Sequence, residues 1–373
     1  MGANSTSPII NININIEQIK NRLLSPRLRL KEKGEIFEMK KDKIAIDPFR
    51  SSGLKIYETK SYQKIQVIKI DKEIVEKILE LDNNDLILAC KTKSDYKGSY
   101  IIKIYRLKNG SYELLQIIDN DNDGYEKKIK NSCNFIIRYK VINYKINDLI
   151  KLTQNKFISI SDLGFKIYSL SNKDETNSEY TLCFNYKNES HDRINYIYPI
   201  NENELIIIYF ITNYTFFGNN YFDIEKYDIK NNKMIKNIYH KKNYKYGNSI
   251  LLKKKYLIII ISGKIIIFDV IKGEKKLGSS SPGNNDKYAS IGKLYNWESI
   301  YDNIFLLVKD EQFFFIQYDD SRNNVNIIGS FQLDIKNKNI QADKFYYDKK
   351  IQIRKFNDKN EFYSYEDEFI NFY

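Results

Sequence analysis

One short strand-like motif recurs seven times along the chain. Each copy is rich in isoleucine, is four or five residues long and ends in an aromatic residue. The copies are residues 54–57, 102–105, 165–168, 223–227, 265–268, 315–318 and 352–356. Their aromatic ends lie 38 to 63 residues apart, about 50 on average. Self-similarity at such a spacing is typical of repeat architectures, whose units bury their apolar faces against one another.

The surroundings of each copy predict antiparallel hairpins. An apolar run and a polar turn come before the motif, and a second turn and a further strand follow it. In the best copy, Ser262 and Gly263 separate two β-branched runs, residues 256–261 and 264–270. A two-residue turn containing glycine between such runs predicts a tight hairpin. Turn residues that tolerate positive φ follow three of the copies. They are Asn109-Gly110, Asn231-Asn232 and Lys272-Gly273.

The strands are continuous apolar runs, such as residues 205–208 and 257–261, and do not alternate with polar residues. Strands of this kind are buried on both faces. Four strands in each unit of about 40 to 50 residues are the signature of a β-propeller. The sequence therefore predicts an all-β fold, a single seven-bladed β-propeller of four-stranded blades over residues 34–373. Residues 1–33 form an amino-terminal arm.

The motif also resembles the third strand of a WD-repeat blade, which ends in Trp-Asp after a Ser-x-Asp turn. Residues 159–168 read Ser-Ile-Ser-Asp-Leu-Gly-Phe-Lys-Ile-Tyr at the matching place. An aromatic residue followed by Asp stands where Trp-Asp would be at Tyr227-Asp228, Phe268-Asp269 and Tyr318-Asp319. The resemblance implies a non-enzymatic platform for protein–protein interactions. Propellers built on other sequence motifs remain open as an alternative.

The arm carries two further signals. Ile10, Ile12, Ile14 and Ile16 alternate with asparagines, which predicts a half-buried strand that pairs with the last blade and closes the ring. The first six residues fit the pattern for N-myristoylation of Gly2. One acyl chain binds membranes weakly, and the basic residues of the arm could add an electrostatic signal. We therefore expect a cytoplasmic protein that associates with membranes if Gly2 is acylated.

Residue types that carry out chemistry are scarce. The chain has two histidines, His191 and His240, and three cysteines without Cys-x-x-Cys spacing. Neither set favours acid–base catalysis or a zinc site. Asp119, Asp121 and Asp123 alternate before a glycine and form a weak calcium candidate, but lysines replace the closing carboxylates of calcium loops. The sequence predicts no enzyme activity and no cofactor. Two polar segments, residues 119–134 and 171–192, are expected to be projecting loops.

The net charge of +12 favours encounter with anionic partners. A basic and aromatic stretch between the fourth and fifth units is expected to be an exposed loop. Its anionic-partner candidates are Lys241, Lys242, Tyr244, Lys245, Lys253, Lys254 and Lys255. The predicted partners are one or more proteins, with an anionic membrane surface reached through the arm as an alternative. Nucleic acid, bound through lysine–phosphate contacts and tyrosine stacking, is the less favoured choice.

Overall fold

The structure is a computed structural model. It describes residues 28–30, 35–40, 43–47, 53–58, 61, 63–70, 73–92, 100–119, 125–130, 136–141, 145–161, 164–172, 178–187, 193–212, 220–242, 246–261, 264–280, 293–296, 304–309, 312–321, 324–332, 341–347, 350–356 and 362–368. Every regular element in these ranges is a β-strand. The chain divides into two compact units, one of residues 32–244 and one of residues 1–31 with 245–373.

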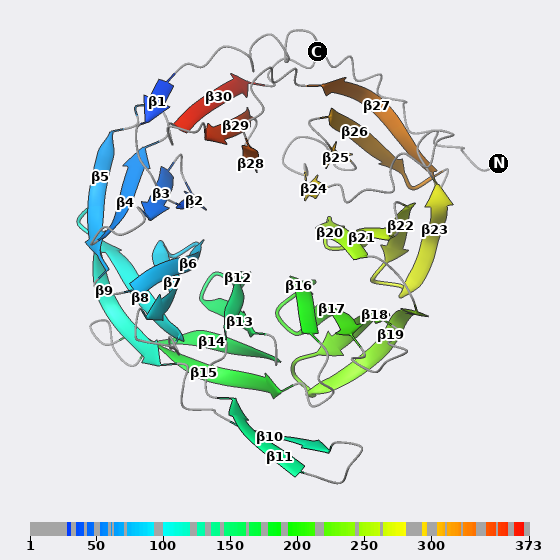
Figure 1. Cartoon of the computed structure of the whole chain (residues 1–373), viewed down its shortest axis with the longest axis horizontal. Helices are drawn as coiled ribbons and strands as arrows, with labels where there is room; N and C mark the ends of the chain where they lie inside the picture. The colour runs from blue at the N-terminus through cyan, green and yellow to red at the C-terminus, as the bar shows by residue number, and fades with distance from the viewer. Residues whose placement is uncertain are drawn as a thin grey trace, which may run out of the picture. The chain divides into compact units, whose positions relative to one another are not determined.

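The unit of residues 32–244 contains four four-stranded antiparallel sheets, each with its strands paired in chain order (Figure 1). The first two sheets are β2 (Glu35–Met39), β3 (Lys43–Asp47), β4 (Gly53–Glu58) and β5 (Lys64–Lys69), then β6 (Glu73–Glu80), β7 (Asp85–Thr92), β8 (Tyr100–Lys108) and β9 (Ser111–Asp119). The next two are β12 (Ile146–Thr153), β13 (Lys156–Ser161), β14 (Gly164–Asn172) and β15 (Ser178–Lys187), then β16 (Arg193–Pro199), β17 (Glu204–Thr212), β18 (Asn220–Asp228) and β19 (Lys233–Lys242).

The other unit contains three four-stranded sheets in its described residues. Two follow chain order: β20 (Tyr246–Leu252), β21 (Tyr256–Ile261), β22 (Lys264–Asp269) and β23 (Glu274–Ser280), then β24 (Lys293–Asn296), β25 (Ile304–Lys309), β26 (Gln312–Asp319) and β27 (Asn324–Gln332). The last has the order β28 (Gln341–Tyr347), β29 (Lys350–Phe356), β30 (Phe362–Glu368) and β1 (Leu28–Leu30). Seven four-stranded sheets in the described ranges match the predicted number of blades.

The first described strand completes the last sheet. In β1, Leu28 pairs with Ser364 and Leu30 with Phe362 of β30, in antiparallel register. The sequence predicted an amino-terminal strand for this position but placed it at Ile10 to Ile16. Those residues lie outside the described ranges, and the strand that pairs begins at Leu28.

The repeated motif marks the third strand of a sheet in six of its seven copies, namely β4, β8, β14, β18, β22 and β26. The seventh copy, residues 352–356, was predicted wrongly. It lies in β29, the second strand of its sheet, and β30 takes the third position. Because an isoleucine-rich run ending in an aromatic residue suits any strand buried on both faces, the motif alone does not distinguish the second strand from the third.

Both segments predicted as projecting loops contain strands. Residues 119–134 include β10 (Tyr125–Lys130), which pairs with β11 (Ile136–Val141) in a separate two-stranded hairpin. Residues 171–192 include β15, the outer strand of its sheet. In β15, buried Tyr180 stands between half-exposed and exposed neighbours. A strand with one wet face carries many polar residues, which is why composition made it look like a loop.

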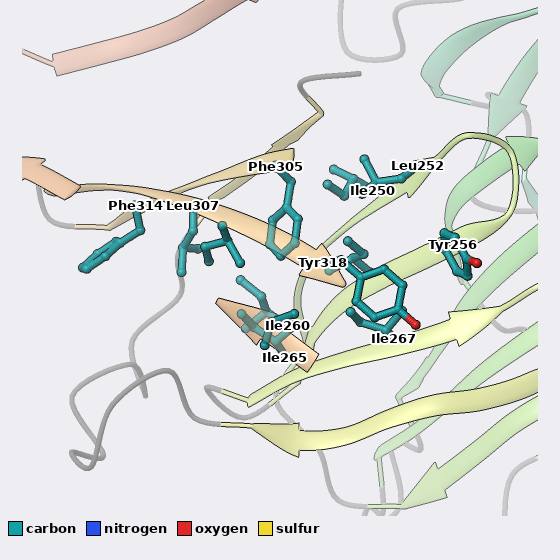
Figure 2. Close-up of a cluster of buried hydrophobic side chains, with 13 residues drawn as sticks. Ile250, Leu252, Tyr256, Ile260, Ile265, Ile267, Phe305, Leu307, Phe314 and Tyr318 are labelled. Atoms are coloured by element: carbon teal, nitrogen blue, oxygen red, sulfur yellow. The ribbon is translucent and has the colours of Figure 1, made fainter. Parts of the chain in front are cut away.

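The inner strands are buried on both faces, as predicted. Residues 86–90 of β7 and residues 205–208 of β17 are fully inaccessible to solvent. In each unit, neighbouring sheets share clusters of buried side chains. Figure 2 shows the cluster shared by the β20–β23 and β24–β27 sheets, in which the rings of Tyr256 and Tyr318 meet edge to face with centroids 5.0 Å apart. This burial supplies the main stabilisation of the fold.

Glutamine side chains also join the outer strands of successive sheets. Gln66 of β5 donates to the carbonyl oxygen of Tyr112 (3.0 Å) and accepts from its N–H (2.8 Å). Gln116 of β9 makes the same two bonds with Tyr180 of β15, at 3.0 and 2.8 Å. Each glutamine stands opposite the residue that precedes the aromatic end of the repeated motif, next to a β-bulge. The same pair of glutamine hydrogen bonds therefore links two successive pairs of neighbouring sheets.

Two carboxylates at the β6–β7 connection, Asp82 in the turn and Asp85 at the start of β7, add polar links between sheets. Asp85 is fully buried, and its two oxygens accept from Arg106 Nε and Nη2, both at 2.9 Å. Its Oδ2 also accepts from the Tyr180 hydroxyl of the next sheet at 2.8 Å and from the Asn83 amide at 3.0 Å. Asp82 is 44% exposed and pairs with lysines of both neighbouring sheets, among them Lys151 at 2.7 Å.

Candidate interaction surface

In each sheet that follows chain order, two turns lie at the same end of the sheet. One joins the first strand to the second, and the other joins the third strand to the fourth. We call this end of the sheet the turn end. A backbone hydrogen bond joins the first turn to the third strand or to the residue just after it in three sheets. The bonds run from Leu170 N of β14 to Asn155 O (2.9 Å), from Ile229 N to Asn203 O (2.8 Å) and from Val270 N to Lys255 O (2.8 Å). The turn end is therefore a braced framework that recurs while its exposed side chains change.

The turn end of the β20–β23 sheet is basic. Its two turns carry Lys253, Lys254, Lys255, Ile271 and Lys272, and this set is called the basic turn end below. All but Lys255 are exposed, and Ile271 is 51% exposed. The corresponding first turns of the two preceding sheets read Gln-Asn and Asn-Glu-Asn instead. The lysines are thus not required by the shared framework.

The β20–β21 turn holds lysines in an unfavourable backbone conformation. Lys255 N donates to Leu252 O at 2.9 Å, and Lys253 and Lys254 between them both have φ of 51°. Asn109 and Gly110, with φ of 50° and 80°, form another turn with two consecutive positive φ values between β8 and β9. Glycine suits this conformation because it has no Cβ, and asparagine because its short polar side chain can hydrogen-bond locally. Lysine brings its Cβ close to the following carbonyl oxygen without such compensation.

Asp269 fixes the second turn of the basic turn end. Its side chain is fully buried, and Oδ1 accepts from the backbone N–H of Ile271 (3.1 Å) and of Lys272 (3.0 Å). Asp228 and Asp319 likewise cap the turns after their own aromatic residues. In these three sheets, the aspartate that the sequence matched to the Asp of Trp-Asp serves as a turn cap.

Lys255 is held by the next sheet. Its Nζ lies 3.7 Å from Asp320 Oδ2 and 4.5 Å from the centre of the Tyr256 ring. Tyr256 and Tyr318 both donate their hydroxyls to Asp320, and the bond from Tyr256 is the main reason that the pKa of this carboxyl is lowered. A hydrogen bond with Tyr256 raises the pKa of Lys255. The negative charge of Asp320 therefore balances Lys255.

The structure describes five of the seven anionic-partner candidates, and these five lie in two different units. Lys241 and Lys242 are the last residues of β19, paired with the start of β18, so the predicted loop is wrong there. They lie at the end of their sheet opposite its turn end and belong to the other unit. Tyr244 and Lys245 fall outside the described ranges. Of the predicted stretch, only Lys253, Lys254 and Lys255 are seen in a turn.

Sequence reasoning missed Ile271 and Lys272 as companions of these lysines. Two strands, β21 and β22, separate the β20–β21 turn from the β22–β23 turn in the sequence. The predicted hairpins would have placed both turns at the same end of the sheet. It also missed the pair across β18 and β19 in which His240 Nδ1 lies 2.6 Å from Asp223 Oδ1. His240 had been assigned to a loop, where no partner could be named.

The remaining predicted sites are largely outside the described residues. Gly2 is not described, nor are Asp121 and Asp123; Asp119 is the last residue of β9, opposite Ile101. Within the described ranges, no three or more His, Cys, Asp or Glu residues are grouped in a way that could hold a metal ion. No helix long and apolar enough to cross a membrane is found there either.

Comparison with known proteins places the fold. No protein-family model matches the chain, and no curated protein matches its sequence. Among solved structures, a chain of the mitotic checkpoint complex aligns with a TM-score of 0.56 at 8% identity, covering 92% of both chains. The Cps50 (Swd1) β-propeller domain of Myceliophteria thermophila aligns with a TM-score of 0.51 at 7% identity, covering 90% of this chain and 98% of that one.

The chain therefore has a β-propeller fold. The four-stranded antiparallel sheets and the two alignments over nine-tenths of the chain agree on this point. At 7–8% identity the likeness concerns the fold and not the activity.

Proposed function

We propose that the protein is a non-enzymatic scaffold that binds one or more partner proteins. The observation that carries this proposal is the turn end, a framework repeated from sheet to sheet on which exposed side chains differ. A rigid framework with variable side chains suits recognition, because little conformational entropy is lost when a partner binds. WD-type propellers commonly work in this way, and this analogy of fold adds support.

The test is crosslinking mass spectrometry on the tagged protein purified from cells of its own organism. The proposal expects a near-stoichiometric protein partner whose crosslinks gather at turn ends and survive 300 mM salt. Purification without any such partner, together with turnover of a small-molecule substrate by the isolated chain, would overturn it.

Cytoplasmic location and acylation of Gly2 belong to the same proposal. Intact mass measurement of the amino-terminal peptide from that material tests the second point directly. A peptide with a free amino terminus at Gly2, or one that retains Met1, would remove the lipid anchor from the account.

A further inference from the structure

We propose that the basic turn end binds an acidic segment of a partner protein, with an apolar side chain of that segment placed against Ile271. This inference rests on the proposed scaffold function and specifies its surface and the chemistry of its partner. Three observations carry it: the backbone conformation of the lysines, the local charge and the exposed isoleucine.

The backbone conformation argues that Lys253 and Lys254 are present for a reason other than folding. Elsewhere in this chain two consecutive positive φ values occur at Asn109 and Gly110, residues that suit them. At 253 and 254 the sequence has lysines instead, at φ of 51° in both cases. Left-handed conformations that persist at a cost are typical of functional sites. Contact with a partner explains why the better turn residues are absent.

The local charge is strongly positive. Lys253, Lys254 and Lys272 are exposed on the two turns, and Lys275 and Lys276 follow at the start of β23. Asp320 balances Lys255, and the buried carboxylate of Asp269, whose Oδ1 accepts from the turn backbone, adds a second negative charge. Glu274 adds one exposed negative charge. A positive patch of this kind is complementary to a carboxylate-rich segment and would speed its association.

Ile271 favours a protein segment over the other anionic partners. It stands 51% exposed beside the lysines, and Asp269 holds its backbone in place. Single-stranded nucleic acid needs exposed aromatic rings for stacking, but Tyr256 and Tyr318 are buried at 4% and 1% exposure. Membrane surfaces are bound through larger apolar faces than one isoleucine provides. An acidic peptide with one apolar side chain matches what is exposed here.

The test uses an array of 15-residue peptides, each with four Asp or Glu residues around one central Leu, Ile or Phe. Binding of the full chain to the best peptides is then measured by fluorescence polarisation at 50 and 300 mM salt. The triple variant Lys253→Glu/Lys254→Glu/Lys272→Glu should weaken binding at least tenfold, and Ile271→Ser at least threefold. A matched control, Lys64→Glu/Lys69→Glu/Lys236→Glu, changes the net charge equally at exposed sites and should stay within twofold.

A second variant separates a loss of binding from a loss of folding. Lys253→Asn/Lys254→Gly restores preferred residues at both positive φ positions, so it should raise thermal stability while it weakens peptide binding severalfold. A silent peptide array, or equal binding by the triple variant and its control, would overturn the inference. So would binding to anionic vesicles or to a single-stranded RNA 20-mer that exceeds peptide binding.

Failure of this inference and failure of the scaffold function can be told apart. If the triple variant still retains the native partner in crosslinking experiments, the basic turn end is not the surface, while the scaffold function stands. If the wild-type chain retains no protein partner, both proposals fall.

Discussion

Two aspartates, Asp82 in the β6–β7 turn and Asp85 at the start of β7, allow a test of how burial changes the contribution of an ion pair. Asp85→Asn removes the charge of a fully buried carboxylate that accepts two bonds from Arg106, one from Tyr180 and one from Asn83. The guanidinium of Arg106 is 25% exposed, so the substitution leaves a largely buried cation without its counter-charge. Breaking a buried pair in this way costs about 3–5 kcal/mol. Because Arg106 keeps some contact with solvent, we expect a loss of about 3 kcal/mol.

Asp82→Asn is the matched control. It removes the same charge three residues earlier, but Asp82 is 44% exposed and its partners Lys40 and Lys151 are 36% and 39% exposed. Exposed ion pairs contribute about 0–1 kcal/mol each, so loss of the two pairs should lower the free energy of unfolding by less than about 2 kcal/mol.

The assay is urea unfolding monitored by circular dichroism and tyrosine fluorescence, with equal slopes required for a valid comparison. Thermal unfolding should show the same order, with Tm lower by about 4 °C for Asp85→Asn and by less than about 3 °C for Asp82→Asn. Equal losses for the two variants, or a larger loss for Asp82→Asn, would refute the reasoning that burial decides the contribution of these pairs.

Three further predictions concern stability. Gly164→Ala should abolish folding or cost more than about 3 kcal/mol, because a Cβ there would lie 2.0 Å from the carbonyl oxygen of Tyr186. Gly110→Ala, at φ of 80° with open space around it, should cost about 1 kcal/mol. Comparison of the melting temperatures of the two variants checks this difference. Gln116→Ala leaves a backbone N–H and C=O of the next sheet without partners and should cost about 2 kcal/mol in urea unfolding, whereas a loss below about 0.5 kcal/mol would contradict the linking role. Hydrogen bonds from lysines lower the pKa of Asp82 from 3.8 to about 2, so its stabilisation is present above pH 4 and is lost as the pH falls towards 2. Acid titration of wild type and Asp82→Asn should therefore converge in stability over this window, and parallel curves would be inconsistent with the lowered pKa.

The sequence predicted the strand pattern because burial on both faces leaves a strong local signal. Six motif copies marked third strands, and the turns at Asn109-Gly110, Asn231-Asn232 and Lys272-Gly273 each contain positive φ. Such features depend on neighbours in sequence, so propensity and pattern determine them. The β15 strand was missed for the opposite reason, since an outer strand has one wet face and resembles a loop in composition.

The candidate site was predictable in part only. Lys253, Lys254 and Lys255 were recognised by their charge, but they were joined to Lys241 and Lys242, which lie in β19. The true companions of the lysine turn, Ile271 and Lys272, follow two intervening strands and are fixed by a buried aspartate whose role no local pattern reveals.

The central claim is a propeller fold in which β1, the first described strand, completes the last of seven four-stranded sheets. Arg29 of β1 stands opposite Tyr363 of β30, and Tyr365 of β30 stands two residues further along that strand. The most direct test is disulfide formation in Arg29→Cys/Tyr363→Cys, read by mass spectrometry of unreduced peptides, with Arg29→Cys/Tyr365→Cys as the control. Directly opposed positions lie within disulfide reach, whereas positions offset by two residues lie about 7–8 Å apart. The account predicts a nearly complete crosslink for the first pair and little for the second. Equal crosslinking of both pairs, or none in the first, would contradict it.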